Sequence, residues 1–198
     1  MSAPPSVADE SRSIGRREDR RGLSWRRVWP AALGVLVAAG TAYGLGDARD
    51  AAPVVVASGL VYLAAGATGR RAAAWIAFAV TFALIGLDKF AAVDALPWLF
   101  ALAAVLLTFG LVTRRTRPWW AFPLQVAGMA AFGALAYVAV QLSPAVGGVL
   151  VGAALLGHAA WDLVHHRAHR VVDQRFAEFC AVLDVLVAVV VVVLALRS

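Results

Sequence analysis

Long apolar segments separated by short polar breaks dominate this chain. The breaks carry charged residues, glycine or proline, as in Gly46-Asp47-Ala48-Arg49-Asp50 and Ser143-Pro144. Several segments reach the roughly 18 apolar residues that a helix needs to cross a hydrocarbon core. The pattern predicts seven transmembrane helices, near residues 28–46, 51–69, 72–88, 96–113, 118–142, 144–166 and 176–196.

A transmembrane β-barrel is excluded, because these segments do not alternate polar with apolar residues. Helices satisfy their backbone hydrogen bonds internally and can therefore span lipid. Composition agrees with this, since hydrophobic residues make up 62% of the 198 residues and charged residues 15%. Soluble domains have about 45–50% and 25%. The predicted fold class is all-α, a polytopic integral membrane helical bundle.

The first 27 residues differ from the rest of the chain. They hold seven arginines and four acidic residues without apolar periodicity, which predicts a disordered basic cytoplasmic tail ahead of a transmembrane domain at 28–198. With this tail inside, only Arg49, Lys89 and Arg197 of the eighteen basic residues fall outside. The positive-inside rule then predicts a cytoplasmic N-terminus, an outward C-terminus and a multi-pass protein of the plasma membrane. Topology also accounts for the net charge of +6, so we expect no nucleic-acid partner.

Three local signals refine this picture. Asp88 and Lys89 are expected to cut the third helix short, and Asp94 is expected to cap the start of the fourth. Gly148 and Gly152 form a pair of small residues one helical turn apart, which favours close helix packing. Faces of this kind also allow a homo-oligomer.

Polar residues concentrate at the end of the chain. All four histidines lie in one stretch, at or just after the end of the sixth segment. At 100° per residue, an arc of about 60° on one helical face holds four polar residues: His158, Asp162, His165 and His169.

The seventh segment carries Cys180 and Asp184, again four residues apart. Counted from a turn near residue 171, His158 and Asp184 lie equally far along two antiparallel helices, and so do Asp162 and Cys180. We therefore expect His158 beside Asp184 and Asp162 beside Cys180, in the cytoplasmic half of the membrane. Gln125 of the fifth segment could reach that level.

Carboxylates at this depth are costly unless they are paired, neutralised or hydrated, so intramembrane His and Asp indicate a functional site. The candidate catalytic residues are His158, Asp162 and Asp184, and the candidate metal ligands are these three with His165. Supporting roles are open to Cys180, His166, His169 and Gln125. The alternative is structural: one interhelical hydrogen bond between His158 and Asp184, histidines in a solvated loop and a cysteine that only packs.

Imidazole and carboxylate ligands suit zinc, iron or manganese. The same groups can also form an acid–base pair or a proton relay without a metal. We expect no other cofactor.

Seven helices, a cytoplasmic N-terminus and polar groups near the inner face resemble the hemolysin III and adiponectin-receptor-like superfamily, which has a zinc site near the inner face. The seventh helix of that family opens with a His-xxx-His pair, whereas this chain has Glu178-Phe179-Cys180 followed by Asp184. The resemblance therefore covers the architecture alone, and no residue role is carried over from it.

Three functions fit the sequence. The first is a membrane-embedded, metal-dependent hydrolase or oxidoreductase that acts on a lipid or hydrophobic small molecule near the cytoplasmic face. The second is a transporter or channel for protons or divalent metal ions that uses the same His/Asp cluster. The third is a structural subunit of a membrane complex. The concentration of polar groups in one region favours the enzyme over the transporter.

Overall fold

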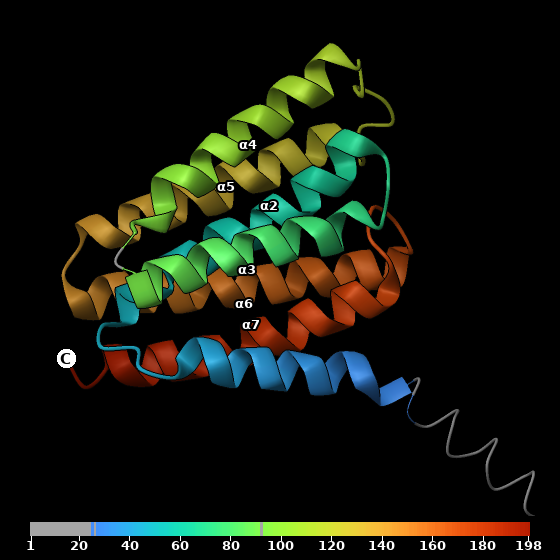
Figure 1. The fold of residues 1–198 in the computed structure, drawn as a ribbon. Coiled ribbons are helices and arrows are strands. Elements are labelled where there is room, and N and C mark those ends of the chain that lie inside the picture. Colours follow the sequence, from blue (N-terminus) through green and yellow to red (C-terminus); the bar gives the residue numbers. More distant parts are fainter. Residues whose placement is uncertain (1–24, 26, 92) are drawn as a thin grey trace, which may run out of the picture.

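The computed structural model describes residues 25, 27–91 and 93–198, and in these it is all-helical (Figure 1). After an N-terminal helix, Arg27–Ala42, come the short 3₁₀ helix η1 and the helices α2 to α7. Their bounds are η1 (Ala48–Ala51), α2 (Ala52–Thr68), α3 (Ala73–Ala91), α4 (Ala95–Val112), α5 (Phe122–Gln141), α6 (Pro144–Ala168) and α7 (Gln174–Ala195). The prediction of a disordered tail lies outside the described residues, except that Trp25 and Arg27 are helical.

Six of the described helices are long and apolar enough to cross a membrane. The N-terminal helix is shorter than the predicted segment 28–46, because it ends at Ala42 and the chain then turns at Gly44, where φ is +72°. At 1.5 Å per residue its length falls short of a hydrocarbon core about 30 Å thick. The fold is thus compatible with a multi-pass membrane protein of at least six spanning helices.

Two other boundary predictions can be compared with the structure. Asp94 caps α4 as expected, since its Oδ1 accepts a hydrogen bond from the Leu96 amide at 3.1 Å. The prediction that Asp88 and Lys89 end the third helix is wrong, because α3 continues to Ala91. Lys89 lies within α3, and its ammonium group reaches the end of the N-terminal helix, where it donates to the carbonyls of Gly40, Thr41 and Tyr43.

Helix α2 forms the centre of the bundle. It packs against α3, α4, α5 and α6, and every residue from Ala52 to Ala67 is buried. Helices α6 and α7 form the most extensive pair, and the N-terminal helix lies along α7, where a Cβ on Gly34 would contact the Phe179 carbonyl. Figure 1 shows this order, with the N-terminal helix and α7 on one side and α4 on the other.

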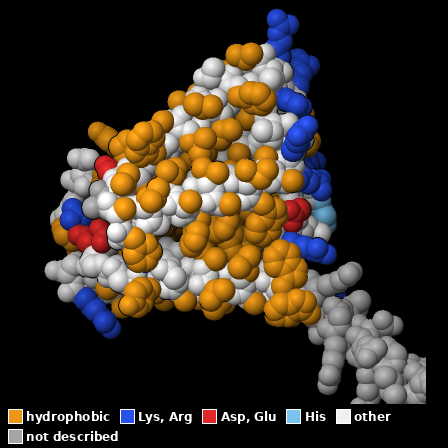
Figure 2. All heavy atoms as spheres, in the orientation of Figure 1, with side chains coloured by type: hydrophobic (Ala, Val, Ile, Leu, Met, Phe, Trp, Pro, Cys, Tyr) orange, Lys and Arg blue, Asp and Glu red, His pale blue; other side chains and the backbone are white. Residues whose placement is uncertain are grey.

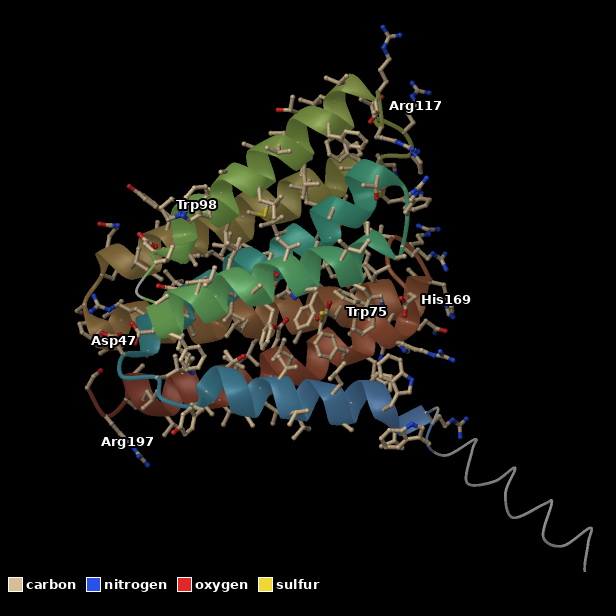
Figure 3. The ribbon with its side chains drawn as sticks, in the orientation of Figure 1. Asp47, Trp75, Trp98, Arg117, His169 and Arg197 are labelled. Atoms are coloured by element: carbon tan, nitrogen blue, oxygen red, sulfur yellow. The ribbon has the colours of Figure 1, made fainter. Side chains whose placement is uncertain are left out.

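Basic side chains gather at one end of the helices (Figure 2). We call this the arginine-rich end; it includes Arg71, Arg115, Arg117, Arg170 and Arg175. Figure 3 places Arg117 and His169 at this end, and Asp47 and Arg197 at the opposite one.

Candidate metal centre

One histidine and two aspartates meet between α6 and α7. His158 Nδ1 lies 2.7 Å from Asp184 Oδ2 and 3.4 Å from Asp162 Oδ2. All three side chains are fully buried, and each offers one ligand atom within 4.8 Å of the other two. The expected pairing of His158 with Asp184 is therefore present.

Local helix geometry explains this meeting. His158 and Asp162 are one helical turn apart on the same face of α6, and the antiparallel α7 brings Asp184 to the same depth. Small residues allow the close approach, since a Cβ on Gly152 would lie 2.5 Å from Val192 Cγ2. His158 and Asp184 lie near the midpoints of α6 and α7, deeper than the sequence suggested.

The central helix supplies two hydrogen-bond donors that the sequence analysis did not identify. Tyr62 donates from its hydroxyl to Asp162 Oδ1 at 2.7 Å, and Ser58 donates to Asp184 Oδ1 at 3.3 Å. Each aspartate thus receives one hydrogen bond from α2 while its other oxygen faces His158. The signal in the sequence was the spacing of Ser58 and Tyr62, which are four residues apart in an otherwise apolar segment.

His165 and Gln125 form a second polar pair. The Gln125 amide nitrogen is 3.2 Å from His165 Nε2, and His165 Nδ1 is 2.9 Å from the Trp161 carbonyl. A carbonyl only accepts and an amide NH₂ only donates, so Nδ1 carries the proton and Nε2 accepts. This assigns a neutral imidazole to His165. His165 is not among the three residues whose ligand atoms lie within 4.8 Å of one another. The Tyr62 ring connects the two sets, with its centroid 4.8 Å from that of His165.

The remaining candidates lie outside the three-residue group. His166 is partly exposed and His169 is exposed. His169 does not share the helical face of His158, because α6 ends at Ala168 and His169 adopts a left-handed conformation with φ of +54°. Cys180 is buried, yet no hydrogen bond joins it to Asp162, whose described partners are Tyr62 and His158.

The donor set fits a divalent metal ion. The group combines two carboxylates with one imidazole, and no Lys or Arg among the described residues pairs with it. Asp162 Oδ2 is buried without a hydrogen-bond partner in the described part of the chain. Ligands of tetrahedral zinc are about 3.3 Å apart, close to the 3.4 Å between His158 Nδ1 and Asp162 Oδ2. The shorter contact to Asp184 would lengthen on binding.

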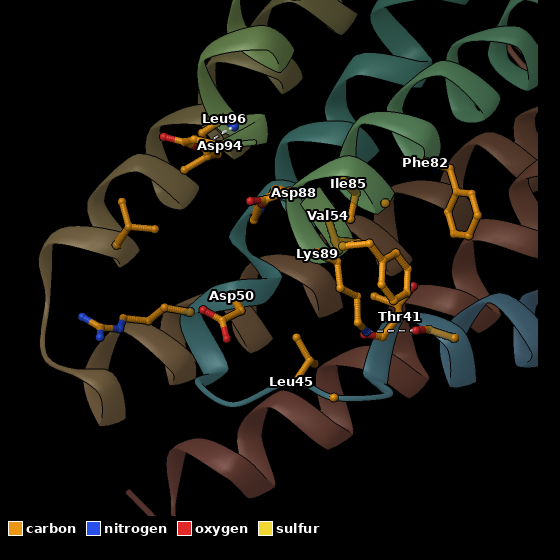
Figure 4. Close-up of a pocket in the computed structure, with 17 residues that line it drawn as sticks. Thr41, Leu45, Asp50, Val54, Phe82, Ile85, Asp88, Lys89, Asp94 and Leu96 are labelled. Atoms are coloured by element: carbon orange, nitrogen blue, oxygen red, sulfur yellow. Dashed lines mark hydrogen bonds between the residues drawn. The ribbon is translucent and has the colours of Figure 1, made fainter. Parts of the chain in front are cut away.

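A narrow cavity, open toward the end opposite the arginines, reaches Ser58, which donates to Asp184, but none of the three grouped residues lines it. Its volume is about 30 Å³, and Ser58, Thr81 and Cys180 lie in its wall. It shares four lining residues with a pocket of about 480 Å³ between the N-terminal helix and α3: Thr41, Val54, Phe82 and Ile85. Figure 4 shows this pocket, with Asp50, Asp88 and Lys89 around it.

Comparison of the chain with known protein families, with curated proteins and with solved structures finds no match.

Proposed function

We propose that His158, Asp162 and Asp184 bind a divalent metal ion (zinc, iron or manganese) in a membrane-embedded enzyme that acts on a lipid or another hydrophobic small molecule. One observation carries the proposal: three ligand side chains are fully buried within 4.8 Å of one another in an apolar bundle. Buried carboxylates are costly without a counter-charge. A cation would supply that charge.

Each residue then has a defined task. His158, Asp162 and Asp184 hold the ion, while Tyr62 and Ser58 orient the two carboxylates through hydrogen bonds. Partners of this kind commonly fix ligand geometry in metal sites. A metal bound there would polarise a carbonyl or activate water, as hydrolysis requires.

The cavities support a hydrophobic substrate. The pocket of about 480 Å³ lies within the roughly 300–1,000 Å³ range of ligand pockets. Phe82, Ile85 and Val54 line it. These residues also line the narrow cavity, which leads on to Ser58, the hydrogen-bond donor to Asp184. With a volume of about 30 Å³, the narrow cavity has room for about one water molecule, so a substrate group would enter by moving Phe82 or Ile85.

Elemental analysis of the purified protein tests the metal site. Wild type should hold stoichiometric metal, and His158→Ala and Asp184→Asn should lose it. His166→Ala and Cys180→Ala serve as matched controls, because both residues lie outside the three-residue group; they should keep the metal. A metal-free wild type that also takes up none on titration would exclude the metalloenzyme.

A lipid-consumption assay tests the reaction. Metal-loaded wild type and the Asp184→Asn variant, which is expected to lack the metal, would each be incubated with total membrane lipid. The lipids would then be compared by mass spectrometry. We expect a species that is depleted only by wild type. If the metal is bound only to wild type and the two lipid profiles are nevertheless identical, the result would count against an enzyme that acts on lipids.

Transport of protons or divalent ions is the second candidate, and one observation favours it. Polar groups continue from Gln125 and His165 through Tyr62 to Asp162, His158 and Asp184, and then to Ser58 beside the cavity. Ionisable chains of this kind are typical of proton relays. Flux measured in proteoliposomes and abolished by Asp162→Asn would favour transport over catalysis.

A further inference from the structure

Another pocket, separate from the His/Asp group, lies at the arginine-rich end. Its volume is about 360 Å³, and loops from three helix connections form its walls. Four arginines line it: Arg71, Arg115, Arg117 and Arg170. No aspartate or glutamate is among its lining residues in the described part of the chain.

Three of these arginines are held in place by the fold. Arg71 donates to the His169 carbonyl at 2.7 Å, and Arg115 donates to the Thr68 carbonyl at 3.2 Å. The Arg170 guanidinium lies over the Trp120 ring, 4.8 Å from its centroid. The two carbonyls, of His169 and Thr68, lie at the C-terminal ends of α6 and α2, where the helix dipole is negative and favours a cation. These contacts use few of the five N–H donors on each guanidinium.

The backbone also makes room for these side chains. A Cβ on Gly69 would lie 2.7 Å from Arg115 Nη1, so a glycine permits this position of Arg115. Asp173, in the adjoining cavity, forms no ion pair with these arginines in the described part of the chain; its carboxylate accepts from Trp75 Nε1 and the Phe176 amide. The arginines therefore lack a carboxylate partner within their own pocket.

We propose that this pocket binds a phosphate-bearing anion. Guanidinium groups bind phosphate oxygens through paired, charge-assisted hydrogen bonds. Basic pockets between helices at a membrane surface bind lipid headgroups in this way. The shared ligand chemistry is a phosphate group, supplied either by an anionic lipid headgroup or by a free phosphate.

Native mass spectrometry and titration of the full-length protein can test the proposal. The protein would be exchanged into nanodiscs of phosphatidylcholine with or without phosphatidylglycerol, and inorganic phosphate would be titrated separately. If the protein retains phosphatidylglycerol and added inorganic phosphate does not displace it, the ligand is a lipid headgroup. Saturable binding of phosphate alone assigns the free ion. Absence of both would overturn the proposal.

Paired variants distinguish a specific binding site from non-specific electrostatic attraction. Arg115→Gln and Arg170→Gln should each weaken binding by roughly tenfold or more, as loss of a charged hydrogen bond implies. Arg114→Gln removes the same charge next to the pocket without removing a lining residue, and it should change affinity less than about twofold. Equal losses in Arg114→Gln and Arg115→Gln would contradict a specific site. Arg115→Lys keeps the charge and guards against misfolding; it should retain an intermediate affinity, because ammonium lacks the paired donors.

Discussion

The hydroxyl of Tyr62 donates a 2.7 Å hydrogen bond to the carboxylate of Asp162, one hundred positions later in the chain. Both side chains are buried. Because the bond joins α2 to α6, the central helix controls the orientation of one candidate metal ligand.

Replacing Tyr62 with Phe should therefore affect both stability and metal affinity. Loss of this bond should lower the free energy of unfolding by about 1 kcal/mol, as for other hydrogen bonds between membrane helices. Metal affinity should fall by roughly tenfold, the usual cost of removing a group that orients a ligand. Thermal unfolding and metal titration measure the two effects. Tyr137→Phe is the matched control on exposed surface, and an equal effect in both variants would refute the role of Tyr62.

The contact between α6, α7 and η1 should be sensitive to a single methyl group. A Cβ on Gly148 would overlap the side chains of Ala48 and Ala195, so Gly148→Ala should destabilise the protein by about 1–3 kcal/mol. Gly86→Ala is the control, because its Cβ would contact nothing within 4 Å; it should be neutral or stabilising. Comparable melting temperatures for the two variants would contradict the packing described above.

Acidification should weaken the cap of η1. Hydrogen bonds from the Arg49 guanidinium lower the pKa of Asp47, while Asp47 also accepts from the Arg49 amide and starts η1. A lowered folded-state pKa means that the stabilisation is complete above the unfolded pKa of about 3.9 and is lost as pH falls through the folded value.

We therefore expect Asp47→Asn to be less stable than wild type by about 0.5–1 kcal/mol at neutral pH, because asparagine keeps the cap of η1 but loses the ion pair with Arg49. That difference should shrink below about pH 4, where the wild-type carboxylate becomes protonated. Melting temperatures of both proteins across this range provide the measurement. A difference that is constant down to pH 2 would argue against the ion pair.

The positive-inside distribution predicts which end faces the cytoplasm. Cys180 is the single cysteine and is buried, so Cys180→Ala gives a background for labelling. In intact cells a membrane-impermeant maleimide should label Ser198→Cys and leave Arg114→Cys unlabelled. The reverse pattern would invert the predicted orientation.

Hydropathy predicted most of the helices because apolar length is a local property of the sequence. It could not show which helices are neighbours. His158 and Asp184 were nevertheless predictable as a pair, since consecutive antiparallel helices fix depth by equal offsets from their turn. Ser58 and Tyr62 were missed because α2 is distant in sequence from α6 and α7, and an apolar segment does not identify its neighbours.

His169 shows a different limit. Its spacing placed it on the face of His158, but α6 ends one residue earlier and His169 turns into the left-handed region. Helix ends of this type usually require Gly or Asn. A histidine at this position gives no such signal in the sequence.

The burial of α2 also affects which substitutions this protein can accept during evolution. Exposed faces of a membrane helix tolerate few polar atoms, whereas the residues of α2 from Ala52 to Ala67 are all buried within the protein. Hydroxyl-bearing residues can thus arise along this helix without being exposed, provided that a neighbouring group accepts a hydrogen bond from them. New specificities of the candidate site should accordingly evolve through α2 more readily than through the exposed sides of α3 and α4.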